Sequence, residues 1–317
     1  MHHVAGGLLA LSSVAYSGSA QAYSQIIAFG DSLSDNGNLL ALVGSPGEPY
    51  YQGRFSNGIT AVEVMARQMG LGLTDYAYGG GQTGTGNVAG TFLNGTGIQG
   101  QIARYGAGLA SARATTDSSA LYFVWGGPND FFAGNAMLSP ATATTAANNL
   151  KADITSLYNL GARDFFVPLM PDLGVTPSAR AANAAHPGYA AVATADSNSF
   201  NSLLSANLQT LSSTLTGIHI QTFDSYSFLH AQIDARAAQG FDVTDSCFNS
   251  SAQTVCGNPE QYLFWDGVHP TAASHEVLGA AFAAAAAVPE PGSWLLMMAG
   301  VSVLALGAKR RRGARNA

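Results

Sequence analysis

Five short apolar runs, rich in β-branched and aromatic residues, recur along the middle of the chain. They cover residues 25–29, 71–76, 121–125, 164–169 and 218–223. Each has the length of a buried strand, and stretches of helical length separate them. This alternation predicts a parallel sheet with helices on both faces. In such sheets functional side chains gather where the strands end at their carboxyl edge.

Helix signals lie between the apolar runs. Thr60 and Glu63 have the spacing of a capping box, which predicts a helix that ends near Gly70. Residues 141–160 and 190–215 are long enough to form two further helices.

The carboxyl-terminal part of the body also reads as helix. Thr271 is suited to cap an Ala-rich helix over residues 272–287. No repeat or linker interrupts residues 23–287, so we expect one domain there. Its Gly- and Ala-rich segments, residues 84–112 and 177–200, show no clear pattern, and we expect them to shape a substrate cleft.

The amino-terminal end has the form of a targeting segment. An apolar stretch over residues 4–16 is followed by Ala20, Gln21 and Ala22, a pattern of small residues typical of a cleavage site. Residues 1–22 are therefore predicted to be a signal peptide.

The carboxyl-terminal end, residues 288–317, has three parts. Pro289, Glu290 and Pro291 precede an apolar run over residues 294–308, and a basic cluster follows it. The run lies at the lower edge of the length that spans a bilayer. This tail resembles the PEP-CTERM sorting signal of Gram-negative bacteria. The resemblance implies export, a transient membrane anchor, cleavage by a sorting protease, and delivery to the cell surface or extracellular matrix.

Without its tail the chain is acidic. The whole sequence has 13 Lys and Arg against 19 Asp and Glu, and the tail holds five of the basic residues and one of the acids. The net charge of the body is therefore about −10. Such a surface repels nucleic acid and anionic lipid head groups, so we expect no nucleic-acid partner.

The chain has two cysteines, Cys247 and Cys256, nine positions apart in a polar segment. In an oxidising compartment we expect them to form a disulfide. Such a bond would stiffen the segment that leads to Asp266 and His269. Two thiols without further ligands do not make a zinc site.

The first apolar run leads directly into a serine. Gly30, Asp31, Ser32 and Leu33 follow it, where a hydroxyl is open to substrate and backbone N–H groups are near. On its own the segment fits equally well a turn capped by a serine. Together with residues 34–38 it resembles the first block of the GDSL (SGNH) esterase and lipase family, in which the serine is the nucleophile.

Three further blocks of this family resemblance follow in order. Residues 53–58 match a segment common in these enzymes, and residues 75–81 resemble the block that supplies an oxyanion glycine. We assign Gly80 to that role, with Gly79 as the alternative. Residues 123–130 end another apolar run and resemble the Gly-x-Asn-Asp element, which implies that Asn129 is an oxyanion donor and Asp130 a structural residue.

The last block, residues 265–271, resembles the Asp-x-x-His-Pro element of the family. It implies that His269 is the general base and that Asp266 orients and stabilises it. The resemblance spans residues 25 to about 275. It implies a flavodoxin-like three-layer α/β/α sandwich and a serine ester hydrolase with the triad Ser32, Asp266 and His269.

Other interpretations of the sequence are weaker. The glycines at 79, 81 and 84 have dinucleotide-site spacing, but no helix signal follows them at once. The remaining body histidines, His186, His219, His230 and His275, have no matching acid in the sequence, and we interpret them as structural or surface residues.

The sequence therefore predicts an exported esterase or lipase that needs no metal and no organic cofactor. Its expected partner is an ester substrate, either a lipid or an acylated polysaccharide. An acyltransferase or a polysaccharide deacetylating esterase would use the same residues. A non-catalytic surface or matrix-binding protein is the remaining alternative.

Overall fold

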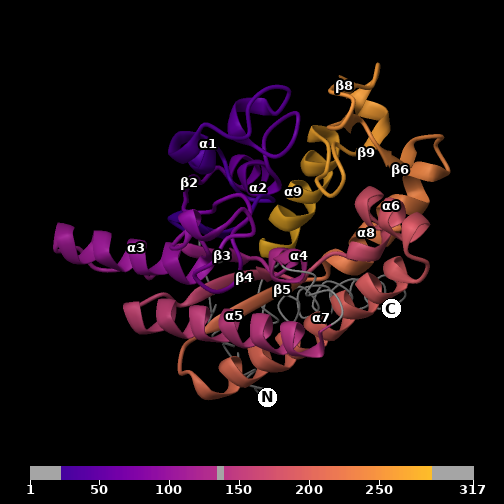
Figure 1. The fold of residues 1–317 in the computed structure, drawn as a ribbon. Coiled ribbons are helices and arrows are strands. Elements are labelled where there is room, and N and C mark those ends of the chain that lie inside the picture. Colours follow the sequence, from indigo (N-terminus) through magenta and orange to yellow (C-terminus); the bar gives the residue numbers. More distant parts are fainter. Residues whose placement is uncertain (1–22, 134–138, 288–317) are drawn as a thin grey trace, which may run out of the picture. The chain divides into compact units, whose positions relative to one another are not determined.

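Five parallel strands form the central sheet (Figure 1). They are β1 (Gln25–Gly30), β2 (Gly72–Asp75), β3 (Leu121–Trp125), β4 (Asp164–Pro168) and β5 (His219–Phe223). Their order, β2-β1-β3-β4-β5, is that of flavodoxin-like folds. The predicted three-layer α/β class is confirmed, and each strand lies within two residues of its predicted bounds.

The computed structural model describes residues 23–133 and 139–287. Residues 23–287 form one compact unit. The predicted signal peptide, the sorting tail and its apolar run lie outside the described residues. Among the described residues, no helix is both long and apolar enough to cross a membrane.

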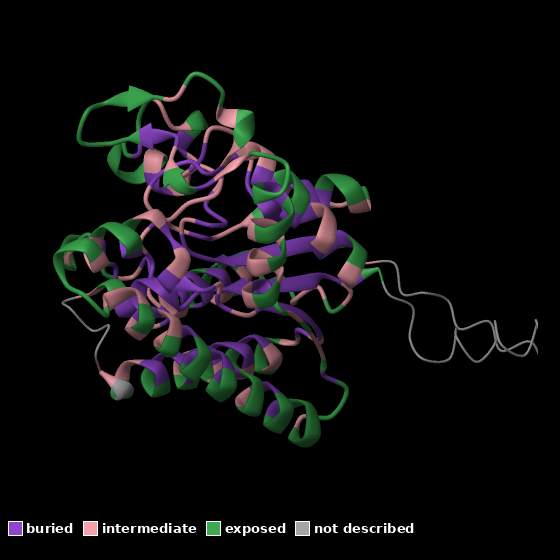
Figure 2. Ribbon diagram, turned by 90° about the vertical axis from the view of Figure 1, so that its right-hand side faces the viewer, coloured by how far each residue is buried: buried purple, intermediate pink, exposed green. Residues whose placement is uncertain are grey.

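Helices cover both faces of the sheet (Figure 1). One face packs against α3 (Ile98–Ala112), α5 (Pro140–Leu160) and α7 (Tyr189–Thr214), and the other against α2 (Ala61–Met69) and α9 (Ala272–Ala286). Successive strand residues point to opposite faces, so Phe165 joins the first core and Phe166 the second. The strands therefore read as continuous apolar runs, and they form the buried layer between the helices in Figure 2.

Shorter elements complete the fold. They are α1 (Asn38–Val43), α4 (Pro128–Phe132), α6 (Pro177–Ala185), α8 (Ser225–Ala237), β6 (Asp242–Ser246), β7 (Phe248–Asn249), β8 (Thr254–Val255) and β9 (Tyr262–Phe264). Strands β6 and β9 pair in parallel, and β7 and β8 form a small antiparallel ribbon.

The predicted helix caps are present. Thr60 and Glu63 form a reciprocal capping box at the start of α2. The Thr271 hydroxyl accepts a hydrogen bond from the Ser274 N–H at the start of α9. By contrast, α3 was not predicted. It buries Ile98, Ile102 and Tyr105 at helical spacing, but its three glycines lower the helix propensity of the segment.

Asp153 on α5 is a buried carboxyl group that affects stability. It is 2% exposed, and no hydrogen-bond partner for its Oδ2 lies among the described residues. Burial, and to a smaller extent the charge of Asp130, raise the pKa of Asp153 to about 9. The folded protein therefore keeps a proton that the unfolded chain has lost above about pH 4, and stability falls as pH rises from there towards 9.

We expect Asp153→Asn to remove this penalty. The variant should be more stable than the parent by about 5 kcal/mol at pH 8, and the two proteins should converge at pH 4 and below. Urea unfolding at the two pH values measures the difference. The same difference at both pH values would contradict titration of Asp153 as its cause.

Candidate active site

Ser32 lies in a single helical turn directly after β1. In this turn the Asp31 carbonyl accepts hydrogen bonds from the N–H groups of Ser34 and Asp35. The side chain of Gln101 fixes the end of the strand, because it accepts from the Gly30 N–H and donates to the Gly30 carbonyl. Ser32 is thus held at the carboxyl end of a central strand, and it is only partly buried.

The sheet order places three predicted residues around this point. β1 lies between β2 and β3, and Gly80 follows β2 while Asn129 follows β3. The carboxyl ends of parallel strands share one edge of the sheet. Ser32 therefore stands between Gly80 and Asn129, and the three residues line the same cavity.

His269 and Asp266 complete a hydrogen-bonded chain to Ser32. His269 Nε2 lies 2.8 Å from Ser32 Oγ, and Nδ1 lies 2.8 Å from each carboxylate oxygen of Asp266. The backbone N–H groups of Val268 and His269 also donate to Asp266 Oδ1. The short loop turns back on itself, since the Trp265 N–H donates to the His269 carbonyl.

The pKa values of the two buried acids at the site, Asp266 and Asp31, are shifted in opposite directions. Burial alone would raise the pKa of Asp266, but the adjacent His269 and the hydrogen bonds outweigh it and lower this pKa to about 2. Asp266 is therefore an anion at neutral pH and can stabilise a charged imidazole. Burial raises the pKa of Asp31, beside Ser32, to about 7, against the hydrogen bond from the Leu33 N–H. This carboxyl group is largely uncharged below neutral pH.

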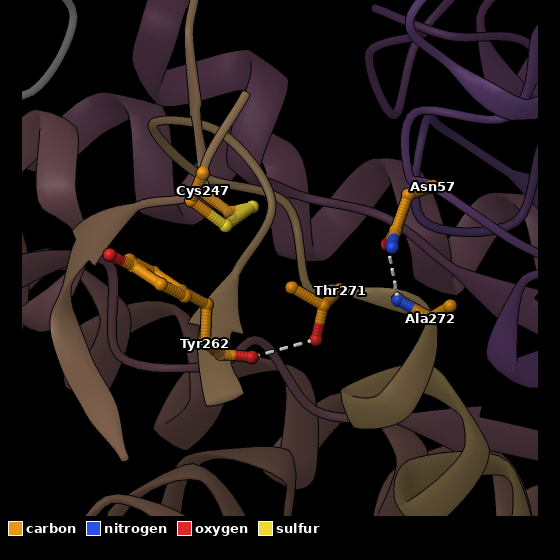
Figure 3. The surroundings of a disulfide bond; sticks show 6 residues. Asn57, Cys247, Tyr262, Thr271 and Ala272 are labelled. Atoms are coloured by element: carbon orange, nitrogen blue, oxygen red, sulfur yellow. Dashed lines mark hydrogen bonds between the residues drawn. A yellow bond between two sulfur atoms is a disulfide. The ribbon is translucent and has the colours of Figure 1, made fainter. Parts of the chain in front are cut away.

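Residues 53–58 contact the loop that carries Asp266 and His269, which we call the histidine loop, although they lie near the other end of the domain sequence. The Phe55 ring packs against the His269 ring, with centroids 5.1 Å apart. The Ser56 hydroxyl donates to the Pro270 carbonyl at 2.8 Å. Asn57 Oδ1 accepts from the Ala272 N–H at 2.7 Å, as Figure 3 shows. These contacts give a physical reason for the second sequence block.

Tyr50 is a contact of the site that the sequence did not indicate. Its hydroxyl donates to Asp266 Oδ2 at 2.7 Å. Burial and the charge of Asp266 raise the pKa of Tyr50, so the phenol keeps its proton. Its ring packs edge-on against Phe248 and Trp265, which fixes its position. Tyr50 and Asp266 are 216 positions apart, and no motif joins them.

We expect Tyr50→Phe to lower kcat about tenfold, since a hydrogen bond to a charged group is typically worth about 1.5–3 kcal/mol. KM should stay unchanged, because Tyr50 is not among the residues that line the cavity. Steady-state kinetics with a short ester separates the two constants. The exposed neighbour Tyr51, changed to Phe, is the matched control. An effect on KM alone would contradict this role for Tyr50.

The two candidate oxyanion glycines differ in what their N–H groups do. The Gly79 N–H donates to Asp35 Oδ2 at 2.7 Å, whereas the Gly80 N–H has no acceptor among the described residues. Gly80 has a φ of 76°, and a Cβ there would lie 2.5 Å from Asn87 Oδ1. The position therefore requires glycine, and its N–H is free for a ligand.

Asn129 and its neighbour fix the facing loop. Asn129 Nδ2 donates to the Gly81 carbonyl at 3.0 Å, which uses one of its two amide hydrogens. Asp130 accepts hydrogen bonds from both the N–H and the hydroxyl of Thr83. Asp130 thus ties the loop after β2 to α4, and it has no direct bond to Ser32 or His269 in the described structure.

Cys247 and Cys256 form a disulfide, with Cα atoms 4.8 Å apart. It lies beside the strand that leads to the histidine loop (Figure 3). Cys247, Phe248 and Trp265 are buried in one cluster, and Tyr50 packs against it. The disulfide therefore belongs to the cluster that positions Tyr50, the residue that donates to Asp266.

A cavity of about 220 Å³ opens at Ser32 and His269. The segments expected to shape it contribute little. Of residues 84–112 only Val88 lines it, and of residues 177–200 none does. Helices α8 and α9 and strand β9 supply much of its wall instead. Residues 177–200 contribute to an adjoining cavity of about 230 Å³, which Ser178, Ala179 and Tyr189 line together with Phe132 and Val268 of the first. The expectation therefore holds in part for residues 177–200 and hardly at all for residues 84–112.

The expectation that no acid matches the other histidines is wrong for His230, although its side chain lies at the surface as expected. His230 Nε2 lies 2.9 Å from Oδ2 of Asp172, an acid 58 positions away. His275 is buried and its Nδ1 accepts a hydrogen bond from the Ala61 N–H, so it is structural. Within residues 23–133 and 139–287, no group of three or more His, Cys, Asp and Glu side chains could hold a metal ion.

Known proteins resemble this chain along most of its length. The family described as GDSL-like Lipase/Acylhydrolase matches residues 26–282, and the PEP-CTERM protein-sorting motif matches residues 287–312. A GDSL esterase/lipase of Arabidopsis thaliana is 30% identical, over 86% of this chain and 94% of that protein.

Two further similarities are more partial. Lipase 1 of Photorhabdus luminescens is 34% identical, over 55% of this chain and 26% of that protein. The structure of a family two carbohydrate esterase from Clostridium thermocellum is 16% identical, with a TM-score of 0.45, and covers 83% of this chain and 63% of that one.

Proposed function

The chain belongs to the GDSL-like lipase/acylhydrolase family and is an ester hydrolase, and from this premise we propose that it cleaves carboxylic esters through an acyl-enzyme on Ser32. The observation that carries the proposal is the hydrogen-bonded chain from Ser32 through His269 to Asp266. A nucleophile, a base within hydrogen-bond reach and an acid that orients the base are the parts that this chemistry needs.

In the proposed mechanism Ser32 Oγ attacks the ester carbonyl while His269 Nε2 takes its proton. Asp266 stabilises the imidazolium that forms, and its short contacts to Nδ1 keep the other nitrogen free as the base. His269 then gives the proton to the departing alcohol. A water molecule then enters, His269 deprotonates it, and the resulting hydroxide attacks the acyl carbon. The bond from this carbon to Ser32 Oγ breaks, Oγ takes back the proton from His269, and the acyl group leaves as the acid.

The negative oxygen of each tetrahedral intermediate needs donors. The N–H groups of Ser32 and Gly80 and the second amide hydrogen of Asn129 are proposed for this role. Each of the three residues lines the cavity. Because they follow three adjacent strands, their spacing is set by the sheet rather than by a flexible loop.

Asn129→Ala should therefore lower kcat by about 10²–10³, the usual loss when a side-chain oxyanion donor is removed. KM should change little, because the donor acts on charge that develops after binding. The control is Asn149→Ala, which removes an amide that donates to Thr83 and does not line the cavity. Activity within threefold of the parent would exclude Asn129 from the oxyanion site.

Covalent labelling tests the nucleophile. A fluorophosphonate probe should modify the folded protein once, and peptide mass mapping should locate the adduct on Ser32. Failure of the probe to react would favour a non-catalytic surface or matrix-binding protein. Labelling without ester hydrolysis, but with acyl transfer to an added alcohol, would instead identify an acyltransferase.

The carboxyl-terminal motif suggests export from a Gram-negative cell. We further propose that residues 1–22 are removed as a signal peptide, that residues 294–308 anchor the chain transiently, and that a sorting protease cuts near Pro289–Pro291. The intact mass of the protein recovered from the medium tests this. A mature protein that retains residues 292–317 would contradict the proposed cleavage.

A further inference from the structure

The cavity at Ser32 continues into the domain beyond the reacting atoms. At its mouth lie Val88 and Phe132, which are 40% and 37% exposed. Its inner walls include Leu263, Phe264 and Leu278, each less than 10% exposed. The cavity therefore leads from the surface near Ser32 to the space between β9 and α9.

Helix α8 closes the other side with a single stripe of residues. Phe228, Leu229, Gln232 and Arg236 all line the cavity, and their spacing of about four puts them on one face of the helix. Leu278 faces them from α9. Two helices and a strand thus enclose a narrow space.

Ser225, Gln232, Arg236 and Ser274 are polar residues of these walls, and the last two have their polar groups engaged by the protein itself. Arg236 is 8% exposed, donates to the Ala273 carbonyl and has its guanidinium over the Phe241 ring. The Ser274 hydroxyl donates to the Leu263 carbonyl. The surface left to a ligand beyond Ser32 is therefore mainly that of aromatic and aliphatic side chains, which favours an apolar chain over a sugar.

The volume of the cavity limits the length of the chain that it can hold. A cavity of about 150 Å³ holds the six carbons of benzene, so about 220 Å³ holds a chain of about eight to ten carbons. Resting on the proposed function, we propose that this space binds the acyl chain of the substrate, and that the enzyme is selective for esters of medium-chain fatty acids rather than for acetyl groups.

The first experiment uses the full chain and p-nitrophenyl esters from acetate to palmitate. The kcat/KM should rise about twofold to fourfold with each added methylene up to eight to ten carbons and then level or fall. The highest value with acetate would overturn the proposal and leave the hydrolase intact. No turnover of any ester, in folded protein, would instead reject the proposed function.

The second experiment fills the space. Leu229→Trp should lower kcat/KM for the octanoate ester at least tenfold and leave that for acetate within twofold. The same substitution at Leu203, which lies on α7 and does not line the cavity, should change neither value. Equal losses for acetate and octanoate in the Leu229 variant, with Leu203→Trp unaffected, would contradict an acyl-chain site.

An enlarged cavity provides a test that does not depend on accommodating a bulky ring. Leu229→Ala should move the preferred chain to one about two carbons longer. An unchanged optimum in this variant would mean that α8 does not bound the acyl chain, and the proposal would fail.

Discussion

Ser32→Ala should lower kcat for ester hydrolysis by about 10⁶, with folding unchanged. The hydroxyl lies 2.8 Å from His269 Nε2, and no other side-chain oxygen is hydrogen-bonded to that nitrogen among the described residues. Without it, the proposed base has no serine to activate, and the oxyanion donors can assist only the attack of a water molecule on the ester carbonyl. Hydrolysis of p-nitrophenyl butyrate measures the loss, and circular dichroism checks the fold.

The control for this prediction lies two residues away. The hydroxyl of Ser34 is buried and has no hydrogen-bond partner in the described structure. Ser34→Ala should therefore keep activity within about threefold, since it removes a group that touches none of the proposed reacting atoms. A loss in both variants would indicate that the turn after β1, rather than the Ser32 hydroxyl, carries the effect.

Asp266→Asn should lower kcat by about 10⁴. An amide carries no negative charge to stabilise the imidazolium. Its NH2 group can also donate to Nδ1, which leaves the proton of His269 on Nε2 and removes the base. The low pKa of Asp266, about 2, means that the parent keeps this anion throughout the range in which a His can act as base. Activity measured at pH 6 to 9 should stay low.

The second His–Asp pair of the structure is the matched control. Asp172 accepts from the side chains of His230 and Thr194, and it is not hydrogen-bonded to Ser32 or His269. Asp172→Asn should change kcat by less than about threefold. A comparable loss in the two variants would mean that His–Asp pairs support the fold in general and that Asp266 has no special role.

The sheet could be predicted from the sequence because buried parallel strands are continuous apolar runs. The predictions for β1 and β3 needed only this signal, and those for the long helices α5 and α7 needed only the length of the segments between the runs. Helix α3 was missed although Ile98, Ile102 and Tyr105 recur at helical spacing, because its three glycines lower the helix propensity of the segment. Strand β6, with the sequence Asp-Val-Thr-Asp-Ser, is too polar to read as a strand.

Some residues of the candidate site could likewise be named from the sequence, and others could not. Ser32, Asp266 and His269 were named from a family resemblance, which the family match now confirms as membership. Their roles remain predictions. Tyr50 and the pairing of His230 with Asp172 were missed, because each contact joins positions that only the folded chain brings together.

The contacts of Phe55, Ser56 and Asn57 with the histidine loop join segments that are synthesised at very different times. Ser32 and His269 lie 237 positions apart, and the loop with the base is held by residues from the opposite end of the domain. A ribosome makes the amino end first, so a growing chain carries the proposed nucleophile long before the proposed base. On the proposed mechanism, ester hydrolysis therefore begins only after nearly the whole domain has been made.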